Sequence, residues 1–263
     1  MRITLLGTGG SAGVPMIGGA DGRGDWGVCD ATEPRNVRTR ASIAIDAGGG
    51  AGALLVDTPP DMRTQLISCG ISRIAAVLFT HAHADHITGL DDVRLLNRVM
   101  DRPLDAYATQ ATLDEIIPRF AYAFRPWQPP GFFRPVLTPR PVATDATLEV
   151  AGLTIRLFDK DHGFVHSLGL RIGAFAYSTD VVELDDAAFA TLAGVDTWVV
   201  GCFQRTPHRT HAWLEIVLGW VTRLRPRRTV LTHMGVDMDW GWLHANLPQG
   251  VEPGFDGQVI EIG

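Results

Sequence analysis

The sequence predicts an α/β protein in which two β-sheets pack face to face and helices cover their outer faces. Apolar stretches of strand length alternate with helical stretches in the order strands, helices, strands, helices, and the two halves of the chain resemble each other. No long linker separates those halves within the 263 residues. Strands of this kind are buried on both faces only in a layered arrangement. We therefore expect one domain spanning residues 1–263.

The first half contains four expected strands and two expected helices. The strands are 2–6, 42–46, 53–57 and 74–79. The first is broken by a glycine run, and the second and third flank a triple-glycine turn. One helix is expected from Pro59 to Gly70, because proline favours the first turn of a helix and glycine follows the last. The second is expected after Asp85, where apolar residues recur at helical spacing.

The second half repeats the pattern of strands and helices, and two segments of the chain are expected to be irregular. Its expected strands are 153–158, 168–172, 174–178, 197–200 and 229–232, with 259–262 as a closing edge strand. Helices are expected over 184–192 and 211–224. Segment 18–40 is rich in Gly, Asp and Arg, which indicates a loop or flap. Segment 118–141 combines prolines with aromatic residues, and we expect an irregular lid or a homodimer surface there.

Bulk composition is that of an ordinary globular protein and excludes several classes. The formal net charge is −6, so a nucleic-acid binder driven by a global positive field is not expected. Three widely spaced cysteines make a disulfide framework unlikely and fit a reducing cytoplasm. The sequence contains no apolar stretch long enough to span a membrane. We expect a cytoplasmic protein without a membrane partner.

The most informative feature is a cluster of metal-type ligands at 81–86. His81, His83, Asp85 and His86 follow the apolar stretch 74–79 directly. In an extended segment alternate residues share a side, so His81 and His83 are able to bind one metal ion together. If a helix starts near Asp85, that carboxylate and His86 point elsewhere and are free for a second ion. Imidazole and carboxylate ligands suit zinc, iron or manganese.

Further ligand-type residues stand at the ends of later strands. They are His162, Asp180 and His233. Because the ends of packed strands gather at one edge of a scaffold, we expect these side chains to join the first cluster. His166 competes with His162 for the same role, and His162 is favoured because it lies nearer the strand end and beside a glycine. Asp180 is the natural bridge between two ions.

This set of residues resembles the metallo-β-lactamase superfamily, whose fold is a four-layer αββα sandwich. The resemblance covers nearly the whole chain. The opening stretch 6–15 and the stretches 36–42, 177–180 and 231–233 are similar to the phosphodiesterase branch, and most of all to the cyclic-phosphate phosphodiesterase of the carbon–phosphorus lyase pathway. More distantly, the chain is similar to tRNase Z.

The resemblance implies two divalent ions, Zn or Mn, in each chain. One would be held by His81, His83 and His162, and the other by Asp85, His86 and His233, with Asp180 bridging. His211 matches a histidine that contacts the scissile phosphate, and it is expected to be catalytic together with Asp85. The implied reaction is hydrolysis of a small, possibly cyclic, phosphodiester by a metal-bridging hydroxide.

The chain departs from these relatives in the flap. Relatives carry a cysteine-rich structural zinc site after the opening motif, whereas Cys29 is the only thiol of segment 16–30 here. One thiolate cannot build a tetrahedral zinc site, so we expect no structural zinc and another means of holding the flap. Arg38 and Arg40 are candidates for phosphate binding or for pairs with acids. Asp57 is a candidate partner of a ligand histidine.

Three other functions are weighed against the phosphodiesterase. A thioester or lactone hydrolase of the same fold would need an acyl pocket and no phosphate-contacting histidine. A tRNA 3′-processing enzyme would need a protruding basic arm, which the net charge of −6 and the absence of a lysine-rich insertion do not favour. A metal-binding protein without turnover would keep the ligands but has no use for His211.

Overall fold

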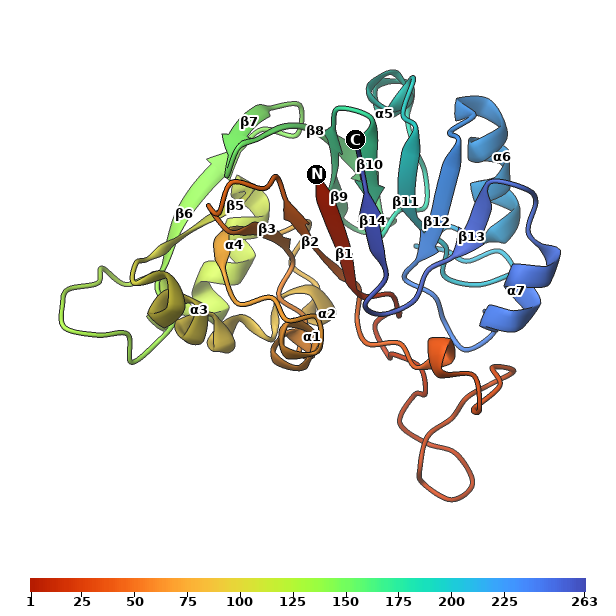
Figure 1. The fold of residues 1–263 in the computed structure, drawn as a ribbon, viewed down its shortest axis with the longest axis horizontal. Coiled ribbons are helices and arrows are strands. Elements are labelled where there is room, and N and C mark those ends of the chain that lie inside the picture. Colours follow the sequence, from red (N-terminus) through yellow and green to blue (C-terminus); the bar gives the residue numbers. More distant parts are fainter.

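The computed structural model describes residues 1–263 and consists of two seven-stranded sheets packed face to face (Figure 1). The first sheet contains, in spatial order, β14 (Val259–Glu261), β1 (Arg2–Gly7), β2 (Ser42–Asp46), β3 (Ala53–Val56), β4 (Ile74–Leu78), β5 (Leu104–Thr109) and β6 (Leu137–Val142). The second contains β13 (Val251–Pro253), β12 (Arg228–Thr232), β11 (Thr197–Gly201), β10 (Phe175–Ser178), β9 (His166–Ile172), β8 (Leu153–Asp161) and β7 (Thr147–Val150). Both sheets mix parallel and antiparallel pairs.

Helices cover the outer face of each sheet (Figure 1). On the first sheet lie α1 (Met62–Ser68), α2 (Ala84–Ile87), α3 (Val93–Met100) and α4 (Gln110–Arg119). On the second lie α5 (Asp186–Leu192), α6 (Leu214–Leu224) and α7 (Trp240–Asn246). Three short 3-10 turns complete the set: η1 (Pro34–Asn36), η2 (Leu90–Asp92) and η3 (Ala121–Phe124). The expected αββα sandwich is confirmed.

Strand β4 shows why the sequence folds into these layers. Its side chains alternate between two apolar cores: Ala76 and Leu78 face the core between the sheets, whereas Val77 and the following Phe79 face the core under the helices. A strand buried on both faces has no polar side, so its sequence is a continuous apolar run. The third core lies between the second sheet and its helices.

The expectation that segment 118–141 is irregular is partly wrong. Residues Leu137–Val142 form β6, which pairs in parallel with β5 at the edge of the first sheet. Its two prolines, Pro139 and Pro141, hid the strand pattern, and proline is tolerated here because an edge strand has one side without ladder partners. Strand β5, helix α4 and helix α7 were not expected from the sequence.

The helix expected from residue 211 begins later. Helix α6 starts at Leu214, and the residues just before it are extended. Ala212 donates its N–H to the carbonyl of Val181 and accepts from the N–H of Phe203. These two bonds hold the backbone in a strand-like conformation, so the helix cannot begin until after Trp213. His211 therefore lies in a loop, not on a helix.

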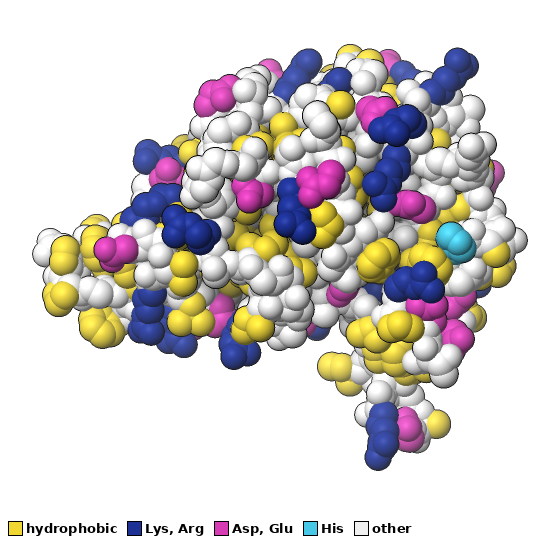
Figure 2. Space-filling view, viewed as in Figure 1, with side chains coloured by type: hydrophobic (Ala, Val, Ile, Leu, Met, Phe, Trp, Pro, Cys, Tyr) yellow, Lys and Arg dark blue, Asp and Glu magenta, His cyan; other side chains and the backbone are white.

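The surface carries no strong single-sign field on the face shown in Figure 2, where basic and acidic side chains are interspersed among apolar ones. This mixture agrees with the modest net charge of −6. None of the helices is both long enough and apolar enough to cross a membrane.

Candidate metal centre

The candidate ligands come from strand ends and the loops that follow them. His81, His83, Asp85 and His86 follow β4, His162 follows β8, Asp180 follows β10 and His233 follows β12. Asp180 has a backbone φ of 44° and His233 a φ of 55°. Non-glycine residues adopt positive φ at a cost, and such conformations concentrate at functional sites.

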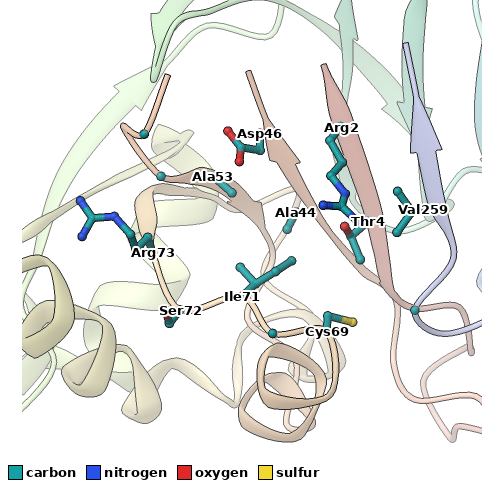
Figure 3. A pocket seen from close by; sticks show the side chains of 14 residues that line it. Arg2, Thr4, Ala44, Asp46, Ala53, Cys69, Ile71, Ser72, Arg73 and Val259 are labelled. Carbon is teal, nitrogen blue, oxygen red and sulfur yellow. The ribbon is translucent and has the colours of Figure 1, made fainter. Parts of the chain in front are cut away.

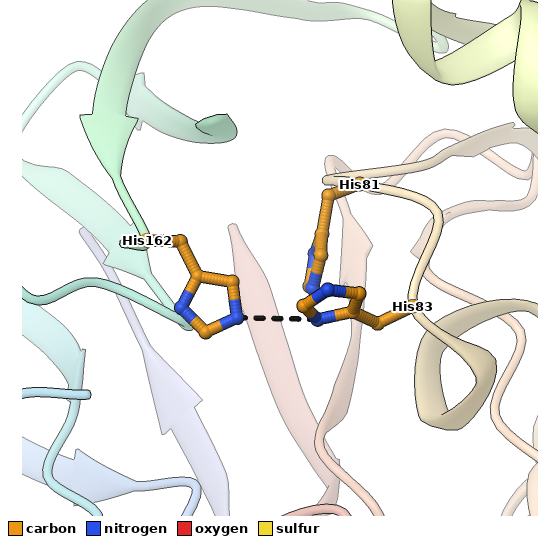
Figure 4. Close-up of side chains that lie close together, drawn as sticks. All are labelled: His81, His83 and His162. Carbon is orange, nitrogen blue, oxygen red and sulfur yellow. Dashed lines mark hydrogen bonds between the residues drawn. The ribbon is translucent and has the colours of Figure 1, made fainter. Parts of the chain in front are cut away.

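One group of ligand atoms contains three histidines. His81, His83 and His162 each place a ring nitrogen within 4.8 Å of the other two (Figure 4). Nε2 of His162 lies 3.2 Å from Nδ1 of His83. The β8–β9 hairpin supplies one member, and the loop after β4 supplies the other two, so the group joins the two sheets.

A second group combines histidines with carboxylates. Asp85, His86 and His233 lie within the same 4.8 Å limit of one another. Asp180 stands between the rings, with one carboxylate oxygen 3.0 Å from Nε2 of His86 and the other 2.9 Å from Nε2 of His233. Asp180 also groups with His81 and His86. Both oxygens contact the second group, and Asp180 also lies within ligand distance of His81 and His162 of the first, as a bridging ligand requires.

Hydrogen bonds on the far side of the rings orient three of these histidines. Nδ1 of His86 lies 2.8 Å from a carboxylate oxygen of Asp57, and Nδ1 of His162 lies 2.6 Å from the carbonyl of Thr210. Nδ1 of His81 lies 3.0 Å from Oγ1 of Thr80, which itself donates to Asp57. When Nδ1 carries the proton, the lone pair of Nε2 points into the centre.

The atoms that point inward fit a divalent metal. Nε2 of His81, His86 and His233 and both oxygens of Asp180 are buried without a hydrogen-bond partner of good geometry in the chain. Buried polar atoms are normally satisfied, and leaving several unpaired in one place costs free energy. Imidazole and carboxylate donors in this combination suit zinc or manganese. These clusters are therefore suited to metal binding.

Electrostatics divide the ligand histidines into two kinds. Burial alone would lower the pKa of His86 and of His233, but Asp180 and the neighbouring carboxylates raise both, that of His233 to about 9, so a bound metal ion would replace a proton on these two rings. Burial lowers the pKa of His81 and of His162, so both rings are neutral at physiological pH. Burial alone would raise the pKa of Asp180, but the neighbouring His233 and His86 outweigh it and hold the pKa well below the usual range. Asp180 is thus ionised.

His211 lies against this centre outside the two main groups, and its ring places a nitrogen within 4.8 Å of ligand atoms of His162 and Asp180. Its ring centroid is 4.6 Å from that of His162 and 4.8 Å from that of His233. Phe203 packs against the same ring at 4.9 Å. Burial, together with the nearby His233, lowers the pKa of His211 to about 3. His211 is accordingly a neutral imidazole at the rim of the cluster.

Other sequence candidates lie elsewhere. His166 is exposed and binds Asp159 at 2.6 Å, so it does not join the cluster. Arg40 forms an ion pair with Asp61 at 3.0 Å. Arg38 is buried beneath the flap and binds other protein groups. Neither arginine is free for a phosphate.

Lys160 was not singled out from the sequence. It is fully buried, and its ammonium group donates to the carbonyl of Thr179, the residue before Asp180. Ser167 donates to the carbonyl of Asp180 itself at 2.6 Å. The β8–β9 hairpin therefore holds the backbone of Asp180 from two sides. The available signal was alternation, since Lys160 follows the buried Phe158 by two residues.

The flap of residues 18–40 is held by a buried polar network. The guanidinium of Arg38 donates to the carbonyl of Met238 at 2.7 Å, to Asn36 Oδ1 at 3.2 Å and to the carbonyl of Gly235 at 3.4 Å. Asp239 accepts from the side-chain amide of Asn36 at 2.8 Å. This network connects the flap to the loop that follows His233. The glycine loop joins it, because Gly10 donates its N–H to the carbonyl of Met234.

A hollow of about 330 Å³ lies on the first sheet (Figure 3). Arg2, Asp46 and Arg73 reach toward it from strand ends and loops. It shares no residue with the histidine clusters, so it is separate from the candidate centre.

Comparison with known proteins identifies the class. Residues 53–234 match the family described as "Beta-lactamase superfamily domain", and the chain belongs to that superfamily. The matched range includes every candidate ligand. The chain thus has the metallo-β-lactamase fold with its histidine and aspartate clusters in place.

Within that class, one solved structure is similar throughout. It is a diphosphatase of the PhnP family, with a TM-score of 0.88 and 31% identity, covering 100% of this chain and 98% of that one. Zinc-bound PqqB from Methylobacterium extorquens has a TM-score of 0.76 at 18% identity, covering 100% of both chains, which shows the shared fold.

One curated relative is an octanoyltransferase of Porphyromonas gingivalis, 33% identical over 98% of this chain. The chain spans about half the length of that protein (51%). Another is the coenzyme PQQ synthesis protein B of Methylobacterium radiotolerans, 28% identical over 100% of this chain and 87% of its own length.

Proposed function

We propose that the protein is a metal-dependent phosphodiesterase that hydrolyses a small, possibly cyclic, phosphodiester. The position of His211 carries this proposal. It places a neutral imidazole beside His162 and His233, and within ligand distance of His162 and Asp180, while each main group already has three ligands without it. A pure metal-binding protein has no use for such a group. The similarity to the PhnP-family diphosphatase supports phosphorus chemistry.

The ligand assignment follows the two groups. His81, His83 and His162 would hold one divalent ion. Asp85, His86 and His233 would hold the other, with Asp180 shared. When bound, the two ions supply Lewis-acid activation of water and of the phosphate oxygens. Asp57 and Thr210 keep the rings of His86 and His162 directed inward, so the site is preorganised.

His211 would act on the substrate directly. With a pKa of about 3 in the free protein, its ring is neutral and donates one N–H. That donor would stabilise charge on a phosphate oxygen or supply a proton to the leaving oxygen. An anionic phosphate beside the ring would raise its pKa, which favours proton donation in the complex. Phe203 keeps the ring in place from its outer side.

An acyl hydrolase is the second candidate, favoured by the similarity to an octanoyltransferase. That relative is about twice as long as the region that matches this chain, so the similarity does not show that the matching half of the relative carries the octanoyltransferase activity. The two candidates differ in how they use His211, since thioester hydrolysis has no phosphate oxygen to contact.

The test is hydrolysis of bis(4-nitrophenyl) phosphate and of a ribose 1,2-cyclic phosphate by metal-analysed protein, with a thioester as the comparison. We expect phosphodiester turnover that a chelator abolishes. His211→Ala should lower kcat about 100-fold or more while the metal content stays unchanged. His244→Ala is the matched control, because His244 is exposed on α7. Thioester turnover alone would refute the proposal.

A further inference from the structure

A cavity of about 440 Å³ adjoins the first histidine group and has no place in the mechanism above. Its walls include His81 and His83, so it opens beside the candidate metal centre. None of its lining residues comes from the loop 203–213 that carries His211. A substrate bound at the metals would therefore extend one substituent toward His211 and the other into this cavity. A volume of this size is typical of small-molecule sites.

Apart from the candidate ligands His81 and His83, the polar groups of the cavity are carboxylates, hydroxyls and the imidazole of His166. Asp159 and His166 lie on the β8–β9 hairpin, and Glu115 lies on α4. His166 Nδ1 contacts Asp159 Oδ2 at 2.6 Å, and Arg119 donates to Glu115 Oε2 at 2.7 Å. Arg119 also donates to the carbonyl of Ala82, which ties this wall to the loop of His81 and His83.

Each of these groups keeps one unused hydrogen-bonding atom. Oδ1 of Asp159, Oε1 of Glu115 and Nε2 of His166 have no partner within the chain. The first two are acceptors, and the third is a donor or acceptor according to its proton. Each carboxylate already contacts a basic side chain, His166 or Arg119, so neither requires a bound cation to balance its charge. Their charge would repel a second anionic group.

From this lining we infer that the cavity is a specificity site for an uncharged, hydroxyl-bearing substituent of the phosphorus, oriented by Asp159 and His166. Because Nδ1 of His166 already donates to Asp159, Nε2 of the neutral ring is an acceptor, so one hydroxyl would donate to Oδ1 of Asp159 and a neighbouring hydroxyl to Nε2 of His166. Asp159 and His166 are specificity residues and not catalytic ones. The inference rests on the proposed function, since it requires a phosphate at the metal centre.

Binding measurements test this site independently of turnover. Uridine 5′-phosphate and 2′,3′-dideoxyuridine 5′-phosphate share the base and the phosphate and differ only in the two hydroxyls. We expect calorimetry on metal-loaded protein to show about three- to ten-fold tighter binding of the hydroxylated nucleotide, the range for hydrogen bonds to groups that remain partly exposed to solvent. His166→Ala and Asp159→Asn should abolish that difference with unchanged metal content.

His244→Ala should preserve the difference, because His244 lies on α7, away from the cavity. Equal affinity of the wild-type protein for the two nucleotides would overturn the inference. So would a difference that persists in both cavity variants, or the absence of measurable uridine 5′-phosphate binding. Hydrolysis of bis(4-nitrophenyl) phosphate in the same preparation reports separately on the proposed function, so the two failures are distinguishable.

Discussion

Replacing Arg38 by methionine should release the flap. Methionine keeps much of the apolar stem but removes the guanidinium, which donates to Met238 O at 2.7 Å, Asn36 Oδ1 at 3.2 Å and Gly235 O at 3.4 Å. Arg38 is only 2% exposed, so water does not readily replace these bonds. Asn36 Oδ1 retains a donor in the N–H of Trp240, and the carbonyl of Gly235 retains one in the N–H of Met238, whereas the carbonyl of Met238 loses the donor that Arg38 provides.

The loss of stability in Arg38→Met follows from the number of buried acceptors that are left without a donor. A buried acceptor left unsatisfied costs about 1–3 kcal/mol, so the unpaired carbonyl of Met238 lowers the free energy of unfolding by about that amount. In a chain of this size each kcal/mol lowers Tm by about 2–4 °C, which predicts a fall of about 2–12 °C. Calorimetry measures Tm, and limited proteolysis measures release of the flap.

Arg23→Met is the matched control for Arg38→Met. Arg23 lies in the same flap, is exposed, and its guanidinium has no hydrogen-bond partner in the chain. Surface substitutions of this kind usually change stability by less than about 0.5 kcal/mol. The reasoning would be refuted if the two variants had the same Tm, or if proteolysis in the flap were no faster in Arg38→Met than in the control.

Three further predictions concern the metal centre and the flap. Asp57→Asn should weaken metal binding about 10- to 100-fold, because the buried carboxylate orients His86; a metal titration matching wild type would contradict this. Chelation should lower Tm, since ions that bind only the folded state stabilise it, yet it should not speed proteolysis of the flap, which is held by Arg38. Burial opposes ionisation of Asp239, but hydrogen bonds from the N–H groups of Asp30 and Trp242 and from Asn36 hold its pKa below the usual value. Its stabilisation is therefore complete above the unfolded-state pKa of about 3.9 and is lost as pH falls below it, so the gap in urea stability between wild type and Asp239→Asn should shrink from pH 5 to pH 3. A constant gap would contradict the role of its charge.

Most of the strands and most of the candidate centre could be predicted from local patterns, whereas the order of the strands within each sheet could not. His81, His83, Asp85 and His86 lie within six residues after a buried strand, so their proximity needs no tertiary information. Strand β4 was recognisable because burial on both faces demands a continuous apolar sequence. Strand β6 was missed because Pro139 and Pro141 contradict strand propensity, and its place at the sheet edge, which tolerates them, is a tertiary fact.

By itself, then, the sequence determined the superfamily and the set of residues offered to the metals, because both are encoded in short-range patterns of apolar and ligand-type side chains. Only the tertiary structure decided between His162 and His166. In the β8–β9 hairpin His166 pairs with Asp161, and its ring contacts Asp159. His162 lies at the end of the same hairpin and faces His83. The tertiary structure alone also revealed the contact of Asp57 with His86 and that of Arg38 with Met238. Such contacts join residues 29 and 200 positions apart, and no local periodicity records which buried polar groups will meet.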